Sequence, residues 1–190
     1  MSTPSRLPVA VRAYSREPPE EDEGTDWSGP EESKWPPAVL VLDTETTTDE
    51  RQALLFGTAR YCRLIEGAYR CVAEELFYVD ELPEERPEEF ARLREYARAN
   101  DADVIVGGDT ELRLRSRTDF VRQVLYSAAF EGAAAVVGFN LPFDLTRLAI
   151  HFGEARGFMY GGFSLGVFGS VDSSTGEYKD RPKDPRLLMK

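Results

Sequence analysis

The sequence predicts an α/β fold in which an antiparallel meander of three strands leads, through helices, to a parallel strand. The first strand is expected at 38–44, where five apolar residues follow Pro36-Pro37, a pattern typical of a strand buried on both faces. Two further runs, 52–65 and 69–79, mix apolar and polar residues, as antiparallel strands with one solvent-exposed face do. Glu66-Gly67 is expected to form the turn between them. Strands followed by alternating helix and strand patterns indicate a mixed sheet flanked by helices.

The second half of the chain supplies these alternating patterns. A helix is expected at 87–99, where a proline and two glutamates suit the first turn. A second helix is expected at 116–131, which a Ser-x-x-Asp capping pattern opens and a glycine closes. The short apolar strand 133–139 then runs into a third helix, expected at 142–152.

Two segments carry weaker patterns. Within 102–115, the Val-Ile-Val sequence at 104–106 is expected as a short strand, and the Gly-rich segment 163–179 is expected as a hairpin that turns at 172–176. A cluster of arginines is expected to form a solvated face rather than a binding site, and comprises Arg113, Arg115, Arg117 and Arg122.

Composition limits the classes of function. A chain of 190 residues can bury the core of one domain, expected at 37–190, whereas residues 1–36 are rich in Pro, Glu, Asp and Ser and are expected to be disordered. The net charge of −11 has the wrong sign for a protein that coats nucleic acid passively. No apolar run approaches the roughly 18 residues of a membrane span, and no signal peptide is recognisable, so we expect a cytoplasmic protein without a membrane partner.

The cysteines and the histidine do not form a metal-binding motif. Cys62 and Cys71 face each other if the hairpin turns at 66–67, and in a reducing cytosol we expect two buried thiols, although a disulfide is geometrically conceivable. His151 is the only histidine and is expected on a helix, as a packing or surface residue rather than a ligand.

Two acids end the first strand. Side chains alternate along a strand, so Asp43 and Glu45 point to the same side. Neighbouring carboxylates repel each other unless a cation lies between them, and hard divalent cations such as Mg²⁺ prefer carboxylate oxygens. The alternative is a strand end at which both acids face water.

A second acidic position follows the strand at 133–139. Asp144 lies in the first turn of the next helix, where the helix dipole alone would favour an acid. Asn140 either caps that helix or binds an acid or a substrate, and Phe143 presents an apolar face beside Asp144. If the two strands are neighbours, the acids meet beyond the carboxyl ends of the strands, where open α/β sheets bind ligands. Three carboxylates around two Mg²⁺ or Mn²⁺ ions would suit two-metal phosphoryl chemistry.

The two motifs together resemble the DEDD superfamily of 3′–5′ exonucleases, which includes polymerase proofreading domains and has a ribonuclease H-like fold. The resemblance covers 37 to about 153 and depends on Asp43-Thr44-Glu45 and on Asn140 to Asp144. It implies that Asp43, Glu45 and Asp144 bind the catalytic metals and that a set of neighbouring residues contacts the terminal nucleotide, namely Thr44, Thr46, Asn140 and Phe143. The implied partner is the 3′ end of a nucleic acid, DNA in preference to RNA, although no residue here recognises a 2′-hydroxyl.

The chain departs from this family in one respect. A third motif should carry a fourth acid, preceded by a Tyr or His that orients the attacking water, and the Tyr178-Lys179-Asp180 sequence is too compact for it. We therefore expect a domain that lacks its last helix and is incomplete at its C-terminus, in a fragment of a longer protein that could include a polymerase domain. On this interpretation the fragment itself is expected to be weakly active or inactive, and the longer protein to be active.

Two other readings remain open. One is a haloacid-dehalogenase-type phosphatase, in which Asp43 would be a covalent nucleophile, but the later Lys and paired acids that it needs are not recognisable. The other is an inactive nuclease fold that serves as a binding or scaffold module, which the missing fourth acid favours.

Overall fold

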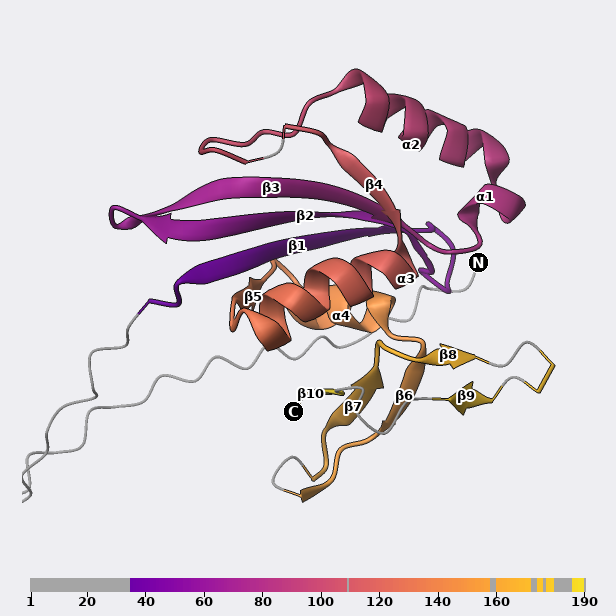
Figure 1. The fold of residues 1–190 in the computed structure, drawn as a ribbon. Coiled ribbons are helices and arrows are strands. Elements are labelled where there is room, and N and C mark those ends of the chain that lie inside the picture. Colours follow the sequence, from indigo (N-terminus) through magenta and orange to yellow (C-terminus); the bar gives the residue numbers. More distant parts are fainter. Residues whose placement is uncertain are drawn as a thin grey trace, which may run out of the picture. The chain divides into compact units, whose positions relative to one another are not determined.

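A mixed five-stranded sheet is the centre of the domain (Figure 1). The computed structural model describes residues 35–190 apart from 109, 158–159, 172–173, 176, 180–185 and 190. The chain divides into two units, Met1–Lys34 and Trp35–Lys190, and all the described residues belong to the second. The segment expected to be disordered, 1–36, therefore lies outside the described residues except for its last two positions.

The predicted meander is confirmed. It consists of β1 (Ala38–Thr46), β2 (Leu54–Ile65) and β3 (Ala68–Tyr78), with β2 antiparallel to both of its neighbours. The turn between β2 and β3 is formed by Glu66 and Gly67, whose φ angles of 51° and 79° suit a tight hairpin turn.

The two cysteines are opposite each other on this hairpin, as predicted. Cys62 and Cys71 are register partners, and both are buried free thiols. Burial raises the pKa of the Cys62 thiol above its ordinary value, and the neighbouring Cys71 adds to this effect.

Two parallel strands complete the sheet. β5 (Ala135–Val137) pairs with β1, and β4 (Arg113–Ser116) pairs with β3, so that the order is β4-β3-β2-β1-β5. The prediction of a strand at 104–106 is wrong, because this segment has irregular backbone. The side chains of Ile105 and Val106 are 61% and 40% exposed. The edge position is taken by β4, because Leu114 packs beside buried Leu76 of β3.

Among the described residues, helical elements connect β3 to β4 and β4 to β5, and one more follows β5. They are α1 (Leu82–Glu85), α2 (Pro87–Ala99), α3 (Arg117–Asp119), two π-helical segments η1 (Phe120–Leu125) and η2 (Ser127–Glu131), and α4 (Leu141–Leu148). The helix predicted at 116–131 corresponds to α3, η1 and η2 in succession. Its predicted cap is confirmed, because Ser116 Oγ accepts a hydrogen bond of 3.1 Å from the Asp119 amide.

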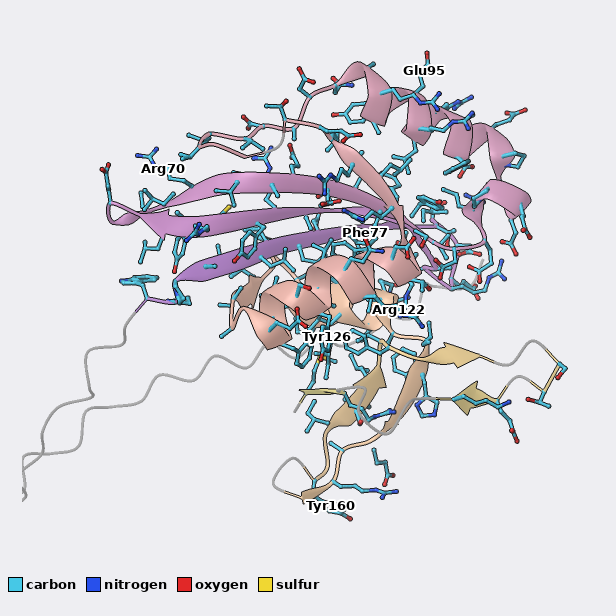
Figure 2. All side chains as sticks on the ribbon, viewed as in Figure 1. Arg70, Phe77, Glu95, Arg122, Tyr126 and Tyr160 are labelled. Carbon is cyan, nitrogen blue, oxygen red and sulfur yellow. The ribbon has the colours of Figure 1, made fainter. Side chains whose placement is uncertain are left out.

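The main core lies between one face of the sheet and η1, η2 and α4. Leu40 and Leu42 of β1 are 0% and 1% exposed and belong to the same apolar cluster as Phe120 and Leu148. Phe77 of β3 stacks on Phe120 with a centroid separation of 4.0 Å. Figure 2 labels Phe77, which lies where the sheet meets the helices. The opposite face carries a smaller cluster, in which Leu76, Ala102 and Leu112 pack with Leu93 of α2.

The C-terminal part of the domain differs from the prediction. α4 ends at Leu148 rather than 152, and His151 lies on a strand, β6 (His151–Glu154). Ala149 has extended φ and ψ angles of −73° and 135°, and Arg117 donates to the Leu148 carbonyl oxygen, so the helix cannot continue.

The predicted hairpin at 163–179 is two separate pairings. β7 (Phe163–Gly166) lies between β6 and β10 (Leu187–Met189), and β8 (Ser170–Val171) pairs with β9 (Tyr178–Lys179). The turn predicted at 172–176 lies largely outside the described residues.

The prediction that the arginine cluster is exposed to solvent is confirmed for Arg113 and Arg122. It is wrong for Arg115 and Arg117. Arg117 is 5% exposed and donates hydrogen bonds to the carbonyl oxygens of Leu148 and Val167. Arg115 Nε lies 2.7 Å from Glu75 Oε2 on β3. Both arginines lie where buried acceptors need donors, which the charge pattern alone does not reveal.

No helix among the described residues is long and apolar enough to cross a membrane.

Candidate functional site at the ends of β1 and β5

Asp43 and Glu45 lie on the same side of β1, as predicted. Both are exposed. Thr44, which lies between them, and Leu42, which precedes Asp43, are buried on the opposite face. The prediction that β1 is buried on both faces holds only for its first three residues, because Val41 is already 40% exposed. η1, η2 and α4 cover the face that carries Leu42, whereas the opposite face is open along this part of β1.

Register places the two acids relative to the rest of the open face. Asp43 pairs with Thr58 and Glu45 pairs with Phe56 on β2. Thr58 in turn pairs with Leu76 on β3, so the acids share a face with the small cluster beneath α2. An exposed pair of carboxylates therefore stands beside a partly covered apolar surface.

Gly57 allows the close approach of the strands at this point. A Cβ atom there would lie 2.6 Å from the Asp43 carbonyl oxygen and would also collide with the Phe77 ring. A side chain at this position would push β1 away from β2 at the site of the acids.

Asp144 is held differently from the other two acids. It is 2% exposed, and its Oδ1 accepts hydrogen bonds from Thr44 Oγ1 at 2.7 Å and from Thr44 N at 3.2 Å. β5 ends at Val137, so no strand backbone accepts from Thr44 on that edge of β1. The Asp144 carboxylate takes the place of that missing acceptor.

The second oxygen of Asp144 is unusual. Oδ2 is buried and has no hydrogen-bond partner among the described residues. Gly138 makes room for it, since a Cβ there would lie 3.2 Å from Oδ2 and 3.0 Å from the Leu42 carbonyl oxygen. A buried acceptor without a donor costs about 1–3 kcal/mol, so a group that supplies a proton or a positive charge would be stabilised here.

These donors fit a divalent metal in chemistry but do not form a closed cage. Carboxylate oxygens are the ligands that Mg²⁺ and Mn²⁺ prefer, and Oδ2 of Asp144 is an orphaned acceptor. Within the described ranges, however, no three His, Cys, Asp or Glu side chains are grouped so that they could hold a metal ion. The structure brings Asp144 to the side chain of Thr44, which lies on the face of β1 opposite to Asp43 and Glu45, so the three carboxylates do not form one group.

The predicted substrate-binding residues divide into two kinds. Thr44 is 7% exposed and positions Asp144, whereas Thr46 is half-buried at the end of β1. Asn140 is exposed and occupies the N-cap position of α4, but its side chain makes no capping hydrogen bond, so the first of the two alternatives for this side chain is not the one adopted. Its backbone carbonyl oxygen accepts hydrogen bonds from the amides of Phe143 and Asp144. The Asn140 side chain therefore remains available to a ligand.

Arg147 is a residue that the sequence reasoning missed. Its guanidinium carbon lies 4.6 Å from the ring centroid of Phe143, and its Nη1 donates to the carbonyl oxygens of Gln52 at 2.6 Å and Arg51 at 3.2 Å. It thus ties α4 to the loop that follows β1. Its position one helical turn after Asp144 was the available signal, because residues three apart share a helix face.

The compact candidate for the third motif, Tyr178-Lys179-Asp180, lies only partly within the described residues. Tyr178 and Lys179 form β9, and Asp180 lies outside the described residues.

Comparison of the chain with models of protein families, with curated proteins and with solved structures yields no significant match.

Proposed function

We propose that this domain is a metal-dependent phosphodiesterase of the DEDD 3′–5′ exonuclease type, with a ribonuclease H-like sheet, acting on the 3′ end of a nucleic acid. One observation carries the proposal: the hydrogen bonds from Thr44 to Asp144 join the two motifs, although 100 residues separate them. The parallel pairing of β1 with β5 supports it further, because it places both motifs at the same end of neighbouring strands.

In this proposal each residue has a distinct part. Asp43, Glu45 and Oδ2 of Asp144 are the ligands for Mg²⁺ or Mn²⁺, which when bound polarises the phosphate and lowers the pKa of a water molecule. Thr44 fixes the rotamer of Asp144 through its hydroxyl and its amide. Asp43 and Glu45 must move, or be drawn in by the ion, because the described residues hold no closed group of three ligands.

The surrounding residues bind the terminal nucleotide. Phe143 offers the edge of an apolar ring, the exposed amide of Asn140 offers a donor and an acceptor, and Thr46 offers a hydroxyl. Arg147 keeps the loop after β1 in place beside them.

The test measures metal binding before activity. Mn²⁺ titrated calorimetrically into the protein is expected to bind, and binding is expected to weaken by at least about tenfold in Asp43→Asn and in Asp144→Asn. Asp49→Asn is the matched control, because Asp49 is exposed in the loop after β1 and is already bound to Thr47 and Arg51. Equal Mn²⁺ binding in all four proteins would show that these acids are not ligands.

Activity is measured separately on 5′-labelled single-stranded DNA and RNA with Mg²⁺ or Mn²⁺. The expected product is a ladder shortened from the 3′ end that disappears in Asp43→Asn. Internal cleavage, or shortening that persists in EDTA, would contradict the proposal.

A second function is favoured by a specific observation. Because no closed three-acid group exists among the described residues, the same fold could bind a nucleic acid end or a protein without hydrolysing it. Mn²⁺ binding without any hydrolysis, at saturating metal, would favour this binding module over the enzyme.

A further inference from the structure

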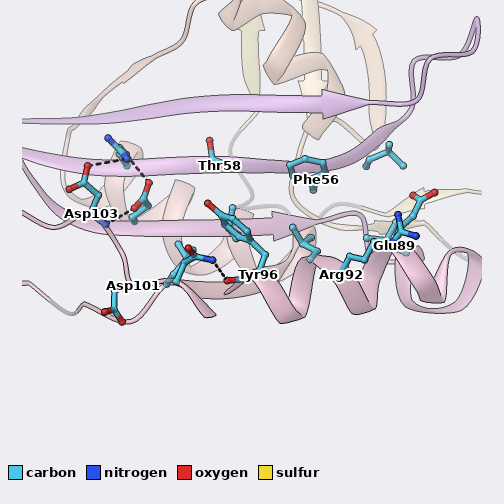
Figure 3. A pocket seen from close by; sticks show the side chains of 15 residues that line it. Phe56, Thr58, Glu89, Arg92, Tyr96, Asp101 and Asp103 are labelled. Carbon is cyan, nitrogen blue, oxygen red and sulfur yellow. Dashed lines mark hydrogen bonds and ion pairs between the residues drawn. The ribbon is translucent and has the colours of Figure 1, made fainter. Parts of the chain in front are cut away.

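An open cavity of about 730 Å³ lies between α2 and the open face of β2 and β3 (Figure 3). Its walls are mainly apolar, and the apolar lining residues are Leu55, Phe56, Leu76, Leu82, Leu93, Tyr96 and Leu112. Figure 3 shows Phe56 and Thr58 on the strand side and Tyr96 and Arg92 on the side of α2. None of the three acids assigned to the proposed phosphodiesterase lines the cavity, but Asp43 and Glu45 are the register partners of the lining residues Thr58 and Phe56 and so lie beside it.

The floor and the walls of the cavity differ in exposure. Leu76, Leu82 and Leu112 are 3–7% exposed and form a closed floor, whereas Tyr96 is 56% exposed and stands at the mouth. An apolar group that replaces water between these walls gains free energy in proportion to the apolar area that it buries. The cavity is therefore suited to one large apolar side chain rather than to a polar ligand.

The charges that line the cavity are mostly negative. Its acidic side chains are Glu74, Glu89, Asp101 and Asp103, and its basic ones are Arg60 and Arg92. Arg60 is not available to an anion, because its Nε lies 2.8 Å from Glu74 and its Nη2 lies 3.4 Å from Asp103. The hydrogen bond that Arg60 donates to the Glu74 carboxylate raises the pKa of Arg60 above its ordinary value.

The acidity extends beyond the lining. The segment 80–103, which includes α1 and α2, contains nine acidic residues and four arginines, a net charge of −5. Nucleic acid phosphates would be repelled by this face, and a second copy of the chain would present the same acidic face to it. A positively charged partner is attracted to it instead.

We propose that this cavity is a docking site for a basic segment of a partner protein, which inserts one large apolar side chain between α2 and the β2–β3 face and sets lysine or arginine side chains against the surrounding carboxylates. Burial of the apolar side chain supplies affinity, and the acidic face supplies selectivity and speeds association. The proposal does not depend on metal binding, and peptide binding is therefore measured in EDTA.

The experiment selects the partner chemistry directly. Random 12-residue peptides displayed on phage are selected on the whole chain in EDTA, after depletion on Thr58→Phe, in which an aromatic ring on the strand side fills the cavity. The expected consensus is a large apolar residue flanked by lysine or arginine. Failure to enrich peptides that distinguish the wild type from Thr58→Phe, or an uncharged or acidic consensus, would overturn the proposal.

Matched variants then test the binding geometry with the selected synthetic peptide. Tyr96→Ala is expected to weaken binding by about tenfold, as truncation of an interface aromatic does. Phe152→Ala is the control, because Phe152 is also 56% exposed but lies on β6, outside the cavity. Equal losses in the two variants would contradict docking at this site.

The contribution of charge is tested by comparing two variants. Asp101→Asn removes an acid that lines the cavity, and Glu66→Gln removes an exposed acid on the β2–β3 turn, outside the cavity. Only the first is expected to weaken binding, and added salt is expected to weaken it in the wild type. Tyr96→Ala replaces an exposed side chain and keeps the test valid if Thr58→Phe does not fold.

Competing occupants give distinct results. Binding of a dT12 oligonucleotide that depends on Tyr96, or self-association that Thr58→Phe abolishes, would assign the cavity to nucleic acid or to a second copy and overturn the proposal.

Discussion

The hydrogen bonds between Thr44 and Asp144 lead to a prediction about stability. In Asp144→Ala, the Thr44 amide and hydroxyl both lose their acceptor inside a nearly closed environment, since Thr44 is 7% exposed. Each buried polar group left without a partner costs about 1–3 kcal/mol, so we expect Asp144→Ala, which leaves two such groups, to lose about 2–6 kcal/mol of unfolding free energy.

Asp144→Asn should behave differently. The amide oxygen can accept both bonds from Thr44, each weakened by roughly 1 kcal/mol when the acceptor loses its charge. The amide nitrogen replaces the orphaned Oδ2, so the cost of a buried acceptor without a donor is removed, and we expect the amide to donate to a carbonyl oxygen near Gly138. Because gain and loss are similar in size, we expect an unfolding free energy within about 1 kcal/mol of the wild type.

The assay is urea unfolding followed by far-UV circular dichroism in EDTA, with equal m-values as the check that the unfolding transition is comparable. A double-mutant cycle of Thr44→Val with Asp144→Ala should show that the two losses are not additive, because both variants remove the same side-chain bond. The reasoning is refuted if Asp144→Asn is as unstable as Asp144→Ala, or if the cycle is additive within about 0.3 kcal/mol.

Three further changes follow from single contacts. Arg117→Ala removes a buried guanidinium from two backbone carbonyl oxygens and should lower the unfolding free energy by about 2–4 kcal/mol, whereas exposed Arg113→Ala should change it by less than about 0.5 kcal/mol in the same urea assay. Gly57→Ala places a methyl group against the Phe77 ring and should cost about 1–3 kcal/mol, measured as a lower thermal midpoint; an unchanged midpoint would show that the strands can separate freely. Because burial raises the pKa of Cys62, its contribution to stability is complete below the ordinary thiol pKa of about 8.5 and is lost as pH rises through the folded-state value, so the wild type should lose more stability than Cys62→Ala between pH 8 and 10, and parallel curves would contradict this.

Local patterns predicted the meander and its turn. The alternation of side chains along β1 and the positive φ angles required at Glu66 and Gly67 depend on residues that are neighbours in sequence. The same holds for the Ser116 cap, which is formed with a residue three positions away. Such features can be predicted from the sequence because the interactions that stabilise them are local.

The end of α4 could not be predicted in this way. Its apolar pattern continues to Phe152, yet the helix stops at Leu148, whose carbonyl oxygen is bound by Arg117, 31 residues earlier. An arginine within a basic run is predicted from the sequence to be solvated. Only the folded structure shows which buried carbonyl groups need a donor.

The candidate site shows the same division. The sequence places Asp43 and Glu45 on one side of a strand and Asp144 in the first turn of a helix, because strand and helix periods are properties of the local backbone. Only the packed structure reveals that Asp144 is buried against Thr44 and that its second oxygen lacks a partner, because these facts depend on where β5 ends relative to β1. The cavity beneath α2 could not be predicted either, since its walls come from β2, β3, α1, α2 and the segment after α2, which meet only when the chain folds.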